Sequence, residues 1–280
     1  MKDILEFTSI DMKEYECIAT KTVPSSAMVF EGHFPGMSIL PGVYHIGFAY
    51  EVSRELLLSL GYASVELIGI LKFNFRKMIL PDQIITIRTS LIKESNNKWE
   101  LLCSNHVEGE LVSSGVLMFQ EQPHEKEVRH CITLHSSEML KSGVDEVCAK
   151  IPNRFPILHV DGILSILPEK EIRTIKNISA NDYVFWGQEP GSHFPEYMLL
   201  EVFAQSAGTL FMQDRDGLPL LGTIRGAIFA NRTYPGEQLT INVTTSRVFS
   251  DKCIVSGTIE TDNKRILELD SLIFALKAYE

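Results

Sequence analysis

The sequence lacks the features that would place it in a membrane or send it out of the cell. None of its 280 residues belong to an apolar run near the roughly 18 residues that a membrane-spanning helix needs. The N-terminal segment MKDILEFTSIDMKEYE carries acidic residues where a secretory signal peptide has an apolar core. We therefore expect a cytoplasmic protein that does not associate with membranes.

Cysteine and basic residues are also scarce. The five cysteines form no C-x-x-C pair and show no His/Cys spacing suited to zinc, so neither a disulfide framework nor a metal site is indicated. No glycine-rich phosphate loop or serine nucleophile motif is present, and we expect no cofactor. The 26 basic residues face 36 acidic ones, and the net charge of −10 argues against a nucleic-acid surface spread over the molecule.

The feature that organises the chain is an internal repeat. Residues 29–51 resemble residues 184–205: FEGHFPG in the first segment aligns with FWGQEPG in the second, and Pro41 aligns with Pro195. Farther along, residues 75–84 match residues 229–239 with one inserted position. Two matches in the same order and at similar separation indicate a duplicated unit.

Each half has the pattern of one long helix followed by several strands, which is typical of the α+β class. Apolar residues fall near helical spacing after Pro41, and residues 197–205 begin the matching helix. Both segments are too apolar for surface helices. Alternation and β-branched residues predict strands at residues 83–92, 99–108, 111–119, 238–248, 253–261 and 266–276.

A polar stretch separates the two sets of strands. Residues 121–150 are rich in His, Glu and Lys and include His124, His130 and His135, which we interpret as solvated. We take this stretch as the linker region and place the first domain at residues 1–147 and the second at residues 148–280.

Three segments carry a resemblance to a known family. The run from Gly32 to Val43, GHFPG followed by LPGV, resembles the G-H-F-P-G-x-x-x-x-P-G-V-x-x-x-E signature of the 3-hydroxyacyl-acyl-carrier-protein dehydratases of bacterial fatty-acid synthesis. In the second half, residues 151–161 resemble that family's N-terminal strand motif and residues 200–208 its central-helix motif. The resemblance implies a double hot-dog fold, in which two long helices are each wrapped by an antiparallel sheet and the sheets join side by side as a pseudo-dimer.

In that family each active site combines a histidine of one unit with a carboxylate on the helix of the other. Here the first half has His33 but carries Gly47 at the carboxylate position, whereas the second half has Glu201 but carries Gln188 at the histidine position. We therefore predict one composite site with His33 and Glu201 as the catalytic residues. The other combination would have no group for acid–base chemistry.

Dehydration of a 3-hydroxyacyl thioester removes a proton from the α carbon and a hydroxyl from the β carbon, and so needs a base and a proton donor in one small volume. Neutral His33 suits the base. Glu201, on an apolar helix, would have its pKa raised by desolvation and could act as the donor. The resemblance places an enolate-binding backbone N–H at Gly42. Gln205, one turn after Glu201, could orient the hydroxyl or the released water, and Ile39 is a further substrate-binding candidate.

Two further residues bear on the second half. Glu196 occupies the position that corresponds to Gly42, where its charge would repel an enolate. His193 offers another H-F-P sequence, but it precedes Glu201 by eight residues, whereas His33 precedes Gly47 by fourteen. We interpret His193 as a coincidence of loop sequence.

The expected partner is an acyl carrier protein with a phosphopantetheine-linked acyl chain. Because carrier proteins are acidic and this chain has a net charge of −10, we expect a local basic patch at the site entrance. The candidates are Lys72, Arg76, Lys77 and Arg232. We expect a monomeric pseudo-dimer or a higher homo-oligomer.

The leading function is dehydration to trans-2-enoyl thioesters in fatty-acid, polyketide or polyene biosynthesis. One alternative is a hot-dog thioesterase or a coenzyme A enoyl hydratase, although thioesterases usually lack the H-F-P-G-x-x-x-x-P-G context. The other is a non-catalytic double hot-dog that binds an acyl chain. Retention of both His33 and Glu201 favours an enzyme.

Overall fold

The computed structural model describes residues 2–121, 139–212, 215 and 217–277. Most of the predicted linker, with His124, His130 and His135, lies outside the described residues. Within the described ranges, no helix is both long and apolar enough to cross a membrane.

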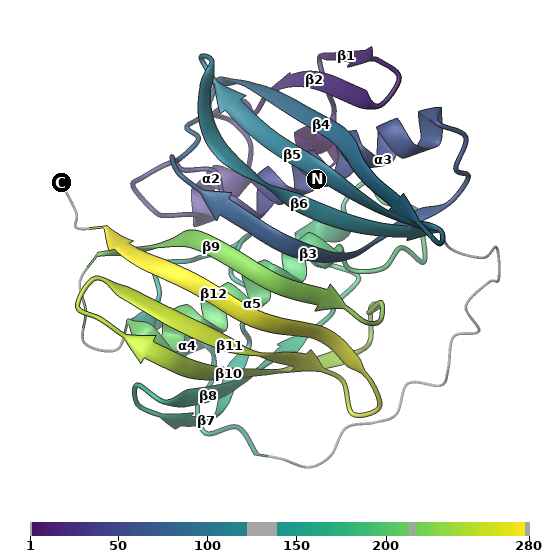
Figure 1. Cartoon of the computed structure of the whole chain (residues 1–280). Helices are drawn as coiled ribbons and strands as arrows, with labels where there is room; N and C mark the ends of the chain where they lie inside the picture. The colour runs from purple at the N-terminus through teal and green to yellow at the C-terminus, as the bar shows by residue number, and fades with distance from the viewer. Residues whose placement is uncertain (1, 122–138, 213–214, 216, 278–280) are drawn as a thin grey trace.

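Twelve strands form one antiparallel sheet that spans both halves of the chain (Figure 1). The first half contributes β1 (Ser9–Met12), β2 (Glu16–Thr22), β3 (Val65–Phe75), β4 (Ile84–Ser95), β5 (Lys98–Val107) and β6 (Glu110–Glu121). The second half contributes β7 (Gly162–Leu167), β8 (Glu171–Asn177), β9 (Leu218–Phe229), β10 (Gln238–Val248), β11 (Lys252–Glu260) and β12 (Arg265–Lys277). The order β1-β2-β4-β5-β6-β3-β9-β12-β11-β10-β8-β7 mirrors itself about the β3–β9 pair.

The helices complete two similar units. In the first, α1 (Lys2–Leu5) and α2 (Val29–Gly32) precede the long helix α3 (Gly42–Ser59). In the second, α4 (Val144–Lys150) and the short helix η1 (Tyr183–Phe185) precede α5 (Glu196–Phe211). Both long helices follow directly after a proline, Pro41 or Pro195, whose fixed φ suits the start of a helix.

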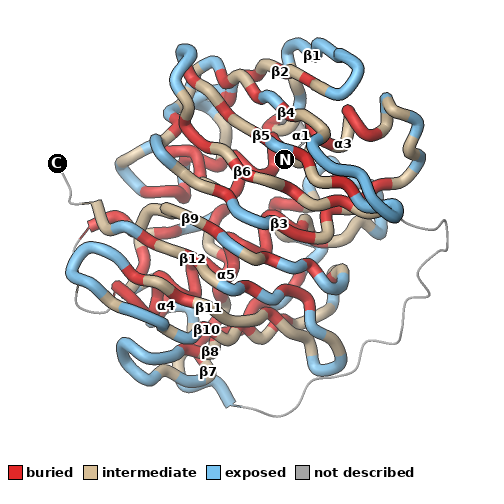
Figure 2. The backbone as a smooth tube through the Cα atoms, in the orientation of Figure 1, coloured by how far each residue is buried: buried red, intermediate tan, exposed pale blue. Residues whose placement is uncertain are grey.

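The two long helices lie in the interior on the same side of the sheet. Helix α3 contacts β2, β3, β4 and β5, helix α5 contacts β8, β9, β10 and β11, and the two helices contact each other. All residues of α5 are buried, and in Figure 2 the long helices lie behind the sheet, whose strands alternate between buried and more exposed segments. An apolar helix of this kind is stable only when it is covered on every side. Two sheet-wrapped helices joined side by side are the double hot-dog arrangement that the sequence predicts.

The predicted strands correspond to β4, β5, β6, β10, β11 and β12 within a few residues. Residues 151–161, taken as a strand motif, contain no strand. Pro152 and Pro156 supply no backbone N–H for a sheet ladder, and the segment instead makes a turn that reaches α5. The boundary near residue 148 falls within α4, which contacts β7 and α5, and the division into two domains there remains a proposal.

Candidate active site

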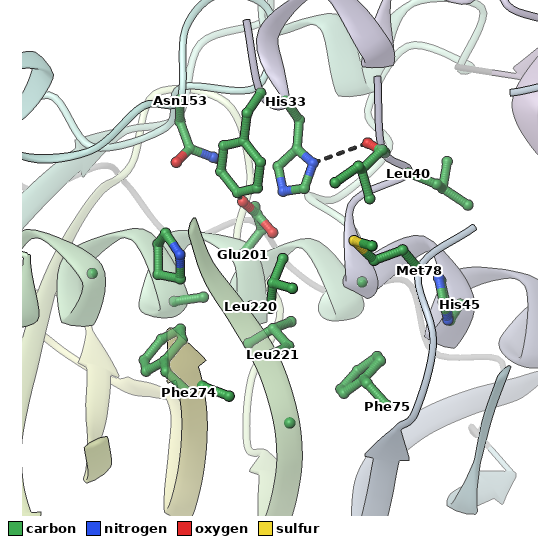
Figure 3. Close-up of a pocket in the computed structure, with 18 of the residues that line it drawn as sticks. His33, Leu40, His45, Phe75, Met78, Asn153, Glu201, Leu220, Leu221 and Phe274 are labelled. Carbon is green, nitrogen blue, oxygen red and sulfur yellow. Dashed lines mark hydrogen bonds between the residues drawn. The ribbon is translucent and has the colours of Figure 1, made fainter. Parts of the chain in front are cut away.

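A cavity of about 230 Å³ lies where the two halves meet. The first half lines it with the loop that follows α2, the start of α3 and the end of β3, and the second half with α5, β9 and β12. Figure 3 shows His33 and Glu201 pointing toward each other across it. The structure therefore brings together the two residues that the sequence predicts to be catalytic.

His33 is held with one defined nitrogen toward the cavity. Its Nδ1 lies 3.0 Å from the carbonyl oxygen of Ile39. Because a carbonyl oxygen only accepts hydrogen bonds, Nδ1 carries the hydrogen and Nε2 keeps its lone pair. Burial lowers the pKa of His33 to about 4, so the imidazole is neutral near pH 7. This is the form that can accept a proton.

Burial shifts the pKa of Glu201 in the opposite direction from that of His33. Its carboxyl is buried on α5, and burial raises its pKa to about 7, while the hydrogen bond from Gln205 works in the opposite direction. Oε1 accepts a hydrogen bond from Gln205 Nε2 at 2.9 Å, and Asn153 Nδ2 lies 3.5 Å from the same oxygen. No described residue binds Oε2. The carboxyl is thus anchored through one oxygen and can hold a proton on the other.

Gln205 connects Glu201 to the segment that precedes β7. Its Nε2 donates to Glu201 and, at 2.6 Å, to the carbonyl oxygen of Ile157, while its Oε1 accepts the backbone N–H of His159 at 2.8 Å. Both amide hydrogens are therefore used within the protein. Gln205 lines the cavity, and its bonds suit it to fix the Glu201 carboxyl.

The start of α3 opens onto the same cavity. Gly42 is the first residue of that helix, where backbone N–H groups have no partner within the helix and the helix dipole is positive. A Cβ atom at this position would approach Leu221 Cδ1 to 3.0 Å and Phe75 Cε1 to 3.3 Å. Glycine therefore leaves the N–H accessible in a narrow space. Ile39 also lines the cavity and positions His33 through its carbonyl group.

The residues at the other combination of positions do not form a comparable site. Gln188 is exposed, and a Cβ atom at buried Gly47 would lie 3.0 Å from the ring of Tyr197. His193 Nε2 lies 3.0 Å from Glu196 Oε1, and neither residue lines the cavity. A tyrosine ring thus occupies the space beside Gly47.

The four basic candidates separate into two groups. Arg76 and Lys77 are exposed and line the cavity, and Lys77 also forms an ion pair with Glu110. Arg232 forms an ion pair with Glu66 at 2.6 Å, and Lys72 is exposed on β3; neither lines the cavity. We keep Arg76 and Lys77 as candidates for the cavity entrance.

Two polar residues of the cavity lining, Asn153 and His45, could not be predicted from the sequence. Asn153, beside Glu201, belongs to the segment 151–161, but nothing in that segment distinguishes it from a loop residue. His45 lies in α3, where the surrounding apolar pattern gave no reason to single it out. Within the described ranges, no three His, Cys, Asp or Glu side chains converge as metal ligands would.

Comparison with known sequences yields a consistent set of relatives. Residues 9–116 match the family described as ApeI-like, ApeI dehydratase. The chain is 40% identical over 117 residues to the 3-hydroxyacyl-[acyl-carrier-protein] dehydratase FabZ of Cupriavidus metallidurans, which covers 39% of this chain and 78% of that protein. The FabZ of Thermotoga neapolitana is 39% identical over 107 residues, covering 36% of this chain and 74% of that protein.

Solved structures share the fold along nearly the whole chain. The PpsC dehydratase domain of Mycobacterium tuberculosis in complex with C12:1-CoA has a TM-score of 0.64 at 10% identity, covering 98% of this chain and 99% of that one. A putative thioesterase from Novosphingobium aromaticivorans has a TM-score of 0.61 at 11% identity, covering 98% and 100%. The fold alone therefore does not separate dehydratases from thioesterases.

The anchoring of Glu201 by Gln205 leads to a first prediction. Replacement Gln205→Leu removes a hydrogen bond that favours the ionised carboxylate, so the pKa of Glu201 should rise further above its ordinary value. Carbon-13 NMR titration of the Glu201 carboxyl measures this directly. Ser206→Ala, a change to a buried polar neighbour on the same helix that does not contact Glu201, should leave the titration unchanged. An unchanged or lowered pKa in Gln205→Leu would contradict this description of the site.

Proposed function

The chain belongs to the 3-hydroxyacyl-[acyl-carrier-protein] dehydratase family, and we propose that it carries out this dehydration at one composite site, with His33 and Glu201 as the reacting pair. The FabZ relatives and the matching family are dehydratases, and we assign the reaction to fatty-acid or polyketide biosynthesis as part of this proposal. The observation that carries the residue assignment is that a neutral imidazole with a free Nε2 and a carboxyl with a raised pKa face one cavity from different halves. The sequence relatives named above are 3-hydroxyacyl-[acyl-carrier-protein] dehydratases, which favours dehydration over the thioesterase and acyl-binding alternatives.

The proposed reaction proceeds through an enolate. Nε2 of His33 takes the proton from the α carbon, and the electron pair moves onto the thioester oxygen, where the backbone N–H of Gly42 stabilises the negative charge. As the electron pair returns to form the Cα=Cβ bond, the β hydroxyl leaves and takes the proton of Glu201 to become water. The products are a trans-2-enoyl thioester and one water molecule. Transfer of the proton from His33 to Glu201 restores the starting state.

Substitution of the reacting pair tests this assignment. His33→Ala and Glu201→Gln should each reduce kcat/KM for a 3-hydroxyacyl thioester by about 10²–10⁴-fold, the usual contribution of an acid–base group. The double variant should be scarcely slower than either single one, because the two residues act as a unit. Gln188→Ala, which changes an exposed residue outside the cavity, serves as the control and should retain activity. Multiplicative losses in the double variant would be inconsistent with a shared step.

The two pKa values predict a bell-shaped pH profile. Activity requires unprotonated His33, which exists above a pKa of about 4, and protonated Glu201, which exists below a pKa of about 7. The value of kcat/KM should therefore rise with pH through the first ionisation and fall through the second. Steady-state rates across this range provide the measurement. A rate that continues to rise above neutral pH would exclude Glu201 as the proton donor.

The acyl group is proposed to arrive on an acyl carrier protein, as the names of the FabZ relatives state for those proteins. Arg76 and Lys77 are exposed at the cavity, where they can attract an acidic partner despite the net charge of −10. Such a contact mainly affects association and weakens as salt screens it.

Charge reversal at Arg76 tests whether this residue contacts the carrier protein at the cavity entrance. Arg76→Glu should raise the KM for carrier-linked substrates at low salt, with a smaller effect on the same acyl group attached to pantetheine alone, which lacks the acidic protein. Lys98→Glu, at the exposed start of β5, is the matched control. Measurement of KM for both substrates at two salt concentrations separates the effects. Equal KM changes for both substrates would show that Arg76 does not contact the carrier.

A further inference from the structure

A second histidine lines the cavity, and the proposed reaction does not use it. His45 lies on α3, three residues after Gly42, and its ring meets the ring of Phe75 edge-on at a centroid distance of 5.8 Å. Figure 3 shows it beyond Met78, away from His33 and on the opposite side of the cavity from Asn153.

Hydrogen bonds beneath α3 fix the tautomer of His45. Asn105 Nδ2 donates to the carbonyl oxygen of His45 at 2.9 Å and to Ser113 Oγ at 2.8 Å, and Ser113 Oγ lies 3.1 Å from His45 Nδ1. The carbonyl can only accept, so the amide nitrogen faces it and uses its second hydrogen on Ser113. Ser113 Oγ has no other acceptor among the described residues, so its buried hydroxyl hydrogen is satisfied only when it is donated to Nδ1. His45 therefore carries its own hydrogen on Nε2, the reverse of His33.

This arrangement leaves one donor facing the cavity. No described residue accepts a hydrogen bond from Nε2 of His45. Nε2 of His159 also has no partner, but that atom is fully buried, whereas Nε2 of His45 is not. Burial lowers the pKa of His45 to about 3, so the ring remains an uncharged donor at neutral pH. Asn105, Ser113 and His45 are all buried, and apolar side chains would fill the same space without the cost of desolvating polar groups.

The order of groups along the cavity identifies what this donor can meet. With the thioester oxygen at Gly42 and the α and β carbons between His33 and Glu201, the acyl chain continues past Glu201. The thiol arm would then leave on the other side of Gly42. Exposed Arg76 and Lys77 line the cavity directly after Phe75, whose ring contacts His45, and His45 therefore lies beside that exit.

We propose that Nε2–H of His45 donates a hydrogen bond to the amide carbonyl nearest the sulfur of the substrate's pantetheine arm. Coenzyme A and carrier proteins share this arm, and its amide carbonyls are strong acceptors. His45 is then a specificity-determining residue that recognises the thiol arm, with Ser113 and Asn105 as its positioning residues. The inference rests on the proposed function.

The experiment compares two thioesters of the same 3-hydroxyacyl group. The N-acetylcysteamine thioester contains the amide, and the pentanethiol thioester has a chain of equal length without it. His45→Phe keeps a ring against Phe75 but removes the donor. It should lower kcat/KM about three- to ten-fold for the N-acetylcysteamine thioester, the range of one neutral hydrogen bond, and leave the pentyl thioester unchanged.

His106→Phe on β5, outside the cavity lining, is the matched control and should affect neither thioester. If His45→Phe does not fold, Ser113→Ala can be compared on the same two thioesters. Loss of the hydrogen bond to Nδ1 allows the His45 hydrogen to move from Nε2 to Nδ1, which weakens the donor. Equal losses on both thioesters, or no loss on either, would overturn the proposal. A wild-type enzyme that dehydrates neither thioester would instead count against the proposed function.

Discussion

Five residue pairs join β3 to β9, from Gly69 opposite Ile228 to Asn74 opposite Thr223, and the candidate active site depends on this ladder. It makes one continuous sheet from two units that would otherwise each end in an unpaired central edge. Because the sheet is continuous, α3 and α5 lie against each other inside it. The loop before α3 and the middle of α5 can then face one cavity.

Within that cavity, desolvation acts on two groups with opposite consequences. A histidine and a carboxyl both resist ionisation when buried, so the pKa of His33 falls and that of Glu201 rises. Neutral imidazole and protonated carboxyl are the forms that dehydration requires. Local hydrogen bonds orient the two side chains. The carbonyl group of Ile39 keeps the hydrogen of His33 on Nδ1, and Gln205 donates a hydrogen bond to one oxygen of Glu201. The apolar surroundings set the protonation states, and a few polar contacts set the orientation.

The duplicated halves differ at the proposed catalytic positions. The second half has exposed Gln188 at the position of His33, and the first has Gly47, covered by Tyr197, at the position of Glu201. A side chain at position 47 would therefore have to displace the Tyr197 ring. One working site per chain is the outcome that these particular residues favour.

Much of this could be predicted from the sequence because the information is local. The repeat, the prolines before both helices and the spacing from His33 to Gly47 are all visible within short segments. The sequence does not predict the central strands β3 and β9 individually, because their role depends on pairing between distant residues, such as Gly69 with Ile228. The contributions of Asn153 and His45 depend on contacts between distant elements, such as the bond from Asn105 on β5 to the backbone of α3. The ion pair of Arg232 with Glu66 could not be predicted for the same reason, because it joins opposite halves of the chain.

In the proposed arrangement, one chain contains a whole active site. Mixing the purified His33→Ala and Glu201→Gln variants, with unfolding and refolding together to allow exchange of chains, tests this most directly. If His33 and Glu201 meet within one chain, neither chain in any mixed assembly has an intact pair, and dehydration of a 3-hydroxyacyl thioester should stay at the level of the single variants. Recovery of a substantial fraction of wild-type activity on mixing would show that the pair forms between chains and would contradict the account.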